Sequence, residues 1–227
     1  LVGSEMCIRD SRMALLEESI HLLFREWFVY LRFPGHERAK VVDGVPEGWE
    51  RAEARQAIAF NPRTKISKDT PRPFVPMGSL STGSMHIVDV GERIPKGGAK
   101  FKNGDTLLAR ITPCLENGKT GFVQFMDSPD DVASGSTEFI VMRSLKVSPS
   151  WVYCLARSPD FRQEAINRMS GSDGRQRVDW KALAGLEILL PSPKVVNDFE
   201  LVADDIFRQI RHLNRHNESL RKARDLL

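Results

Sequence analysis

The segment from Val195 to Leu227 carries a seven-residue repeat that limits what the chain can fold into. Apolar side chains recur at every seventh position, at Phe199, Ile206, Leu213, Leu220 and Leu227. A repeat of this period predicts one helix, about 50 Å long, with an apolar seam along it. Because an exposed seam is unfavourable in water, this helix needs a partner, either in the same chain or in a second copy.

A second row of seam positions, three residues after the first, is weaker. It holds Val202 and Ala223, but Gln209 and His216 interrupt it. The seam is therefore expected to rest mainly on its first row.

Apolar residues at helical spacing also predict a helix over residues 15–31, with one wide apolar face. Leu16, Leu23 and Trp27 lie on this face and are expected to pack along a helical seam. The sequence FPGHE then ends the helix, because proline and glycine do not continue it. This helix is one candidate partner for the C-terminal helix.

The opening sequence, LVGSEMCIRDSR, resembles a translated sequencing adapter more than a protein element. It has no apolar stretch of the kind found in a secretory signal. Residues 1–12 are therefore predicted to be non-native and to lie outside the fold, and the true start of the chain is left open.

Composition indicates a globular chain from a reducing compartment. The cysteines Cys7, Cys114 and Cys154 are scattered and form no C-x-x-C pair, which argues against disulfides and a zinc knuckle and favours a cytoplasmic location. No apolar run is long enough to cross a membrane. The net charge of +3 permits contact with nucleic acid without requiring it.

Residues 51–145 change character, because short β-prone runs alternate with clusters of Gly, Asp, Asn and Pro. Runs such as TLLARI and EFIVMR predict a compact, mostly antiparallel sheet. Ser148 and Ser158, each followed by proline, predict the starts of two short helices, and Asp179 is expected to cap a helical turn. The expected fold class is α+β: a small, mostly antiparallel, β-rich domain with short helices, flanked by long coiled-coil-forming helices.

The segment SGSDGRQRVDW, residues 170–180, is too polar for a core strand and too rich in glycine for a helix. Arginine can form two hydrogen bonds with guanine and glutamine two with adenine, whereas serine hydroxyls and glycine amides suit phosphates. The loop residues predicted to contact DNA are Ser170, Ser172, Arg175, Gln176 and Arg177. The alternative is a solvated turn whose arginines pair with acids such as Asp173 and Asp179.

Further candidates lie near turns of the predicted sheet. Arg110, Asn117 and Lys119 surround the turns of LLARITPCLENGKTGF, and Ser136 lies in ASGSTEF. These side chains can flank a DNA cleft beside residues 170–180, which we call the glycine loop. The alternatives are a plain hairpin turn at Asn117, a buried tie between sheet and loop at Arg110, and a strand-entry turn at Ser136.

No catalytic residue or metal site is expected in the chain. Asn61-Pro62-Arg63 lacks the aromatic residue of the N-P-P-[YF] motif of DNA amino-methyltransferases, and no glycine-rich loop for a nucleoside cofactor is present. A nuclease of the P-D…[DE]-x-K kind needs Asp160, Asp179 and Lys181 to meet at a metal. Both aspartates are instead placed like residues at helix starts.

Six motifs carry a resemblance to a known family: LLFREWFVYLRFPGHE, VDGVPEGWE, GDTLLARITPCLENGKTGFVQF, GSTEFIVMR, SPDFRQEAINRMSGSDGRQRVDW and LRKARDLL. Together they extend from about residue 15 to the C-terminus. In this order, the motifs resemble the C-terminal half of a specificity (S) subunit of type I restriction–modification systems. The resemblance implies that residues 13–33 end a central conserved helical region, 34–50 form a linker, 51–190 form one target recognition domain, and 191–227 form a truncated C-terminal conserved helix.

The resemblance also implies a function without catalysis. Such a domain reads one half of a bipartite sequence in double-stranded DNA, and the helices dock methyltransferase (M) subunits, with restriction (R) subunits as further partners. Adenine methylation with S-adenosylmethionine, and cleavage driven by ATP with Mg²⁺, would belong to those partners, and this chain would hold no cofactor. Because full-length members carry two recognition domains, a homodimer through the helices would restore the second one.

Two rival hypotheses stay open. A stand-alone nuclease or methyltransferase predicts metal- or cofactor-dependent activity from the chain alone. A purely architectural adaptor predicts that the helices matter, that the globular domain binds protein, and that the chain does not bind a DNA probe.

Overall fold

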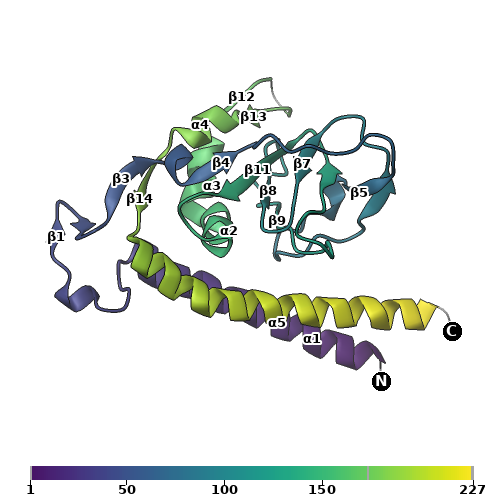
Figure 1. Cartoon of the computed structure of the whole chain (residues 1–227), viewed down its shortest axis with the longest axis horizontal. Coiled ribbons are helices and arrows are strands. Elements are labelled where there is room, and N and C mark those ends of the chain that lie inside the picture. The colour runs from purple at the N-terminus through teal and green to yellow at the C-terminus, as the bar shows by residue number, and fades with distance from the viewer. Residues whose placement is uncertain (1, 173, 226–227) are drawn as a thin grey trace.

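The chain is described by a computed structural model that covers residues 2–172 and 174–225. It consists of a mixed domain of strands and short helices that rests on a pair of long helices (Figure 1). The long helices are α1 (Val2–Phe24) and α5 (Pro193–Asp225). The short ones are α2 (Pro149–Arg157), α3 (Pro159–Asn167) and α4 (Trp180–Ala184).

Strands and single helical turns make up most of the remaining regular structure. A π-helical turn, η1 (Arg25–Val29), extends α1, and the 3-10 turns are η2 (His36–Arg38), η3 (Ala54–Gln56) and η4 (Met77–Ser79). The first seven strands are β1 (Val41–Val42), β2 (Val45–Pro46), β3 (Glu50–Glu53), β4 (Ile58–Phe60), β5 (Arg72–Val75), β6 (Gly91–Arg93) and β7 (Ala99–Phe101). The others are β8 (Thr106–Ala109), β9 (Thr120–Phe122), β10 (Ala133–Gly135), β11 (Phe139–Ser144), β12 (Met169–Ser170), β13 (Arg177–Val178) and β14 (Glu187–Leu190).

Two four-stranded sheets form the centre of the domain. One has the order β4-β11-β8-β9 and is antiparallel throughout, and the other has the order β6-β5-β10-β7. In the second sheet only the β5–β10 pair is parallel. The entry and exit of the domain lie side by side, because β3 pairs with β14. The structure therefore confirms the predicted α+β class with a mostly antiparallel sheet.

The short helices begin where the sequence predicts. The hydroxyl of Ser148 accepts a hydrogen bond from the Trp151 amide at 3.1 Å, and that of Ser158 accepts one from the Phe161 amide at 3.3 Å. Asp179 caps α4 in the same way, through the Lys181 amide. These caps depend on residues within one turn of each other, so the local sequence is sufficient to predict them.

The long helices pair antiparallel within the chain, and the N- and C-terminal ends lie at the same end of the pair (Figure 1). Near the opposite end, Phe199 of α5 packs against three aromatic residues: Phe24 and Trp27, with ring centroids 6.2 and 5.9 Å away, and Phe28 at 5.0 Å. Phe199 is completely buried. The predicted seam is thus covered inside one chain, and its pattern no longer calls for a second copy.

The seam differs from the predicted one in its second row. Phe199, Ile206 and Leu213 pack against the core, as do Leu16, Leu23 and Trp27 from the other helix. The second row lies four residues after the first rather than three: Ala203, Ile210 and Asn217 are fully buried, whereas Val202 is 43% exposed. The predicted companion row is therefore one residue out of register. Leu220 is half-buried, and Leu227 lies outside the described residues.

Residues 2–12 continue α1 as helix, although the sequence places them outside the fold. The Asp10 carboxylate accepts a hydrogen bond from the side-chain amide of Asn217 on α5, at 2.8 Å. That this segment is foreign to the protein stays a prediction.

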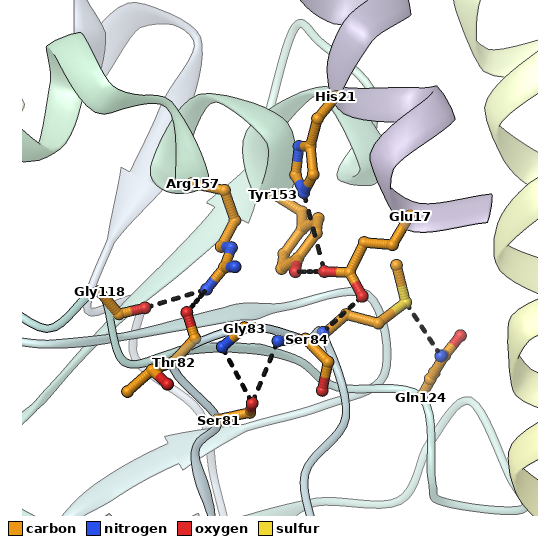
Figure 2. A network of polar contacts seen from close by, with 11 residues as sticks. Glu17, His21, Ser81, Thr82, Gly83, Ser84, Gly118, Gln124, Tyr153 and Arg157 are labelled. Atoms are coloured by element: carbon orange, nitrogen blue, oxygen red, sulfur yellow. Dashed lines mark hydrogen bonds and ion pairs between the residues drawn. The ribbon is translucent and has the colours of Figure 1, made fainter. Parts of the chain in front are cut away.

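A buried carboxylate fixes the domain to α1. Figure 2 shows Glu17 reaching from α1 to Tyr153 of α2. Glu17 is 4% exposed and accepts hydrogen bonds from the Tyr153 hydroxyl and, at 2.9 Å, from the Met85 amide. The Nε2 atom of His21 lies 3.7 Å from the carboxylate, which is too long for a hydrogen bond but close enough for a charge interaction. Glu17 therefore joins α1, α2 and the loop before β6.

The surroundings of Glu17 favour its charged form. Burial raises the pKa of Glu17, but the nearby His21 and the hydrogen bonds from Tyr153 and Met85 outweigh that effect and hold the pKa below its usual range. Burial, together with the neighbouring negative charge of Glu17, raises the pKa of Tyr153 well above its ordinary value, so its hydroxyl stays a donor. Because the folded-state pKa of Glu17 is depressed, its contribution to stability is present above the ordinary carboxyl pKa. That contribution is lost as the pH falls through the folded-state pKa.

Glu17→Gln is expected to lower the free energy of unfolding by about 1–2 kcal/mol at pH 7, because the amide keeps the shape but loses the charge that strengthens these hydrogen bonds. The difference from wild type should shrink as the pH falls below the carboxyl range. Urea denaturation at several pH values measures it, with the exposed neighbour Glu18→Gln as control. A difference that is the same at pH 7 and at pH 3 would contradict the charge-based explanation.

Candidate nucleic-acid interface

The glycine loop lies on the side of the domain away from the α1–α5 pair, where β12 and β13 form a short hairpin (Figure 1). Ser170, Ser172 and Arg175 are exposed, whereas Gln176 and Arg177 are half-buried. Gly171 has a φ of 128°, and a Cβ there would lie 3.2 Å from the carbonyl oxygen of Arg175. Only glycine fits this tight turn without strain. Asp173, one of the acids expected to pair with the arginines, lies outside the described residues.

The second half of the loop is fixed to the neighbouring sheet by backbone hydrogen bonds. The Thr112 amide donates to the carbonyl oxygen of Gln176 at 3.0 Å, and the Val178 amide donates to that of Arg110 at 2.9 Å. The Arg110 amide in turn donates to the carbonyl oxygen of Glu138 at 3.0 Å. Three segments that are distant in the sequence therefore meet at this point, and Arg110, Glu138 and Arg177 lie together.

Glu138 organises the two arginines at this meeting point. Its carboxylate accepts hydrogen bonds from Nε of Arg177 at 3.0 Å and from Nη2 at 2.8 Å, and Nε of Arg110 lies 3.5 Å away. The hydrogen bond from Arg177 lowers the pKa of Glu138, and the same contact raises the pKa of Arg177. An acid does pair with an arginine of the loop, as the alternative interpretation held, and that acid is Glu138. Asp179 instead caps α4 through the Lys181 amide.

Two hollows open beside these residues and share Arg110. The larger, of about 940 Å³, is lined by Asn61, Pro62, Arg63, Thr64, Lys65, Ile66, Gly98, Ala99, Lys100, Arg110, Thr137, Phe139 and Val141. The smaller, of about 520 Å³, is lined by Arg110, Ser170, Arg177, Asp179, Trp180 and Lys181. We call the two together the basic cleft, after its cationic side chains Arg63, Lys65, Lys100, Arg110, Arg177 and Lys181. Among the described residues, Asp179 is the one carboxylate that lines it.

The walls of the larger hollow are fixed by the sheet. The Asn61 side chain accepts a hydrogen bond from the Val141 amide at 2.9 Å, which holds the start of the extended segment that carries Arg63 and Lys65. On the other wall, Gly98 precedes β7, which carries Lys100. A Cβ at Gly98 would lie 2.0 Å from the carbonyl oxygen of Gly135, so only glycine allows the two chains to come this close.

Lys119, Asn117 and Ser136, which were predicted to contact DNA, do not line this cleft. Two of them form hydrogen bonds with backbone atoms instead. Lys119 donates from Nζ to the carbonyl oxygen of Met77 at 3.3 Å, and neither Lys119 nor Asn117 lines the hollows. The Ser136 hydroxyl accepts a hydrogen bond from the Glu138 amide at 3.2 Å, as in a local turn. The structure thus brings Arg110, Ser170 and Arg177 into one cleft, with Ser172, Arg175 and Gln176 on the adjoining loop.

Sequence reasoning missed three cations of the larger hollow: Arg63, Lys65 and Lys100. The sequence does carry a weak signal for them, because basic residues recur in PRTKISK and KGGAKFK. Such short basic runs are also common on solvated loops. They become informative only once the fold places the two segments on opposite walls of one hollow.

The residues of the possible nuclease motif are not brought together. Asp160 at the start of α3 lines a different hollow from Asp179 and Lys181. Over the described ranges, no cluster of three or more His, Cys, Asp or Glu side chains is placed to hold a metal ion. Among the described helices, none is both long and apolar enough to span a membrane.

Comparison with known proteins relates the chain to one group. No protein-family model matches it. It is 31% identical over 141 residues to the type I restriction enzyme EcoAI specificity subunit of Escherichia coli, a match that covers 59% of this chain and 24% of that protein. It is 34% identical over 142 residues to the EcoEI specificity subunit of the same organism, covering 59% of this chain and 23% of that protein. The matched segment thus spans about a quarter of the length of these curated relatives.

A solved structure with a similar fold covers nearly the whole chain. The crystal structure of the HsdS subunit from Thermoanaerobacter tengcongensis superposes with a TM-score of 0.52 at 15% identity. The match covers 98% of this chain and 52% of that one. At this identity the likeness shows a shared fold, and the fold includes the long helices as well as the domain.

Proposed function

We propose that this chain, which is similar to the specificity subunits of type I restriction enzymes, has no catalytic role of its own, binds double-stranded DNA through the basic cleft and reads one half of a bipartite target. Residues 51–190 form the target recognition domain, residues 13–33 and 191–227 form the conserved helices, and residues 34–50 connect them. The other half of the target is read by a second recognition domain, from outside this chain or from a second copy paired through the helices.

The observation that carries the proposal is the basic cleft with the glycine loop at its rim. Six cationic side chains from four separate segments converge on adjoining hollows, and one carboxylate lines them in the described part of the chain. Arginine and lysine that converge in this way neutralise phosphates, while the exposed polar loop supplies side chains suited to base edges. Glu138 pairs with Arg110 and Arg177, but Arg63, Lys65 and Lys100 have no carboxylate partner among the described residues. A globular domain whose only role is to bind protein does not need this concentration of positive charge.

The α1–α5 pair positions the domain and docks the methyltransferase subunits. Several large apolar side chains on its surface are exposed, among them Leu15 at 64%, Leu22 at 49% and Leu201 at 74%. A surface that binds another protein exposes apolar side chains of this kind. In this scheme the partner subunits use S-adenosylmethionine for methylation, or ATP and Mg²⁺ for cleavage with the restriction subunit, and this chain binds none of them.

Titration of a fluorescently labelled duplex with the whole chain, at several KCl concentrations, tests the proposal. With about four phosphates neutralised, the logarithm of the binding constant should fall with the logarithm of salt with a slope of about −3 to −4. If the polarisation does not change even at low salt, while the chain still captures a methyltransferase subunit, the architectural adaptor is the better account.

A further inference from the structure

We infer that Glu138 is a positioning residue that holds Arg177 and Arg110 as the base-reading side chains of the basic cleft, whereas Arg63, Lys65 and Lys100 hold phosphates. This assignment rests on the proposed function, because it divides the same cleft into two parts with different tasks. The observation that supports it is that the Glu138 carboxylate contacts both Arg177 and Arg110 at the point where the two hollows meet.

The backbone around Glu138 makes this contact rigid. Arg110 follows β8 and donates its amide to the Glu138 carbonyl oxygen, and the Val178 amide next to Arg177 donates to the carbonyl oxygen of Arg110. Residues 111 and 177 also form an isolated antiparallel bridge. The three residues therefore have fixed relative positions before any ligand arrives, which is the condition for discriminating between bases.

The contact leaves the guanidinium of Arg177 able to bind a base. The group has five N–H donors. Glu138 accepts from Nε and Nη2, and the carbonyl oxygen of Arg175 accepts from Nη1 at 3.1 Å. Each terminal nitrogen carries two hydrogens, so one N–H remains on Nη1 and one on Nη2. Two N–H groups on adjacent nitrogens match the O6 and N7 acceptors of guanine.

The cations of the larger hollow are different. Arg63 and Lys65 are exposed and Lys100 is half-buried. Among the described residues, no carboxylate lies within ion-pair distance of these three. A long, unrestrained cation suits a phosphate, whose charge can be approached from many directions, and it contributes to affinity for any sequence.

Because Glu138 is negatively charged, its effect on DNA affinity distinguishes a positioning role from a purely structural one. A carboxylate beside a DNA cleft repels phosphates, so its presence costs affinity for random duplex. Removing the charge should therefore raise or preserve that affinity while the arginines lose their fixed direction. A residue needed only for folding would instead lower binding to all sequences together.

The experiment selects duplexes from a random pool with the wild-type chain and with Glu138→Gln, which keeps the size of the side chain but not its charge. The wild type should enrich a defined sequence. The variant should bind random duplex at least as tightly as the wild type, but its preference for the enriched sequence should fall roughly 10- to 100-fold. Arg177→Lys, which keeps the charge but not the fork, should lose the preference as well.

Glu187→Gln is the matched control, because Glu187 forms a cross-strand pair with Arg51 at 3.0 Å that does not line the basic cleft. It should leave the preference unchanged. If Glu138→Gln and Arg177→Lys select as sharply as the wild type, or lose specific and random binding in parallel, the inference is overturned. If the wild type binds no duplex at all, the proposed function fails instead, so the two failures are distinguishable.

Discussion

Alanine in place of Phe199 is expected to lower the free energy of unfolding by about 3–5 kcal/mol. The ring is completely buried at the crossing of the two long helices and contacts Phe24, Trp27 and Phe28. Alanine leaves a cavity that these rings can fill only partly, so the change loses both buried apolar area and packing contacts. The loss should separate the helices at the end where the chain enters and leaves the domain.

Chemical denaturation followed by far-ultraviolet circular dichroism measures this change, and Val202→Ala is the control. Val202 lies on the same helix, three residues further on, and is 43% exposed. Its replacement by alanine should cost less than about 1 kcal/mol. If the two variants lost the same free energy of unfolding, the observed register of the seam would be contradicted. Val202 belongs to the predicted companion row, whereas the observed row has the buried Ala203 in its place.

The elements of the fold that depend on neighbouring residues could be predicted from the sequence. Ser148 and Ser158 mark helix starts because a cap and its partner amides lie within one turn. The first row of the α5 seam follows from a strict seven-residue spacing. The second row could not be fixed in the same way, because both three- and four-residue steps fall on one helical face. The packing of α5 in the folded chain decides between them, because Ala203 and Ile210 are buried whereas Val202 is exposed.

The contacts of the candidate site depend on chain folding over long distances. The Arg177 partner Glu138 lies far away in the sequence, and only the pairing of β8 with β11 and the bridge near Arg177 bring the two together. Local acids such as Asp179 were the obvious candidates from spacing alone, yet Asp179 caps α4. The composition of the glycine loop was sufficient to predict contact with DNA. The composition of the segments that carry Arg63, Lys65 and Lys100 was not.

Lys119 and Asn117 were predicted to contact DNA because only their local sequence could be judged. They follow a strand-like run and lie in a turn, which is where DNA-contacting residues often occur. The structure uses Lys119 to bond the carbonyl oxygen of Met77, and Arg157 bonds the carbonyl oxygen of Gly118 between them (Figure 2). This turn is therefore bonded to α2 within the domain instead of lining the cleft.

The basic cleft is the proposed binding surface for DNA. Replacing Arg63, Lys65 and Lys100 together by alanine removes the three cations of the larger hollow that have no carboxylate partner among the described residues. We expect the variant to bind duplex roughly 100-fold more weakly, at about 1 kcal/mol for each lost phosphate contact. The loss should be uniform across sequences, because phosphates carry no sequence information.

A matched triple variant, with alanine at Arg51, Arg55 and Lys146, removes the same charge from positions that do not line the cleft. Duplex titrations of the wild type and both variants across KCl concentrations then test the claim directly. The account predicts that the cleft variant loses roughly 100-fold in affinity and that its salt slope becomes shallower by about 3, while the control variant stays close to the wild type. Equal weakening by both triple variants, with the same change in slope, would mean that net charge alone attracts DNA and would contradict the assignment of the basic cleft.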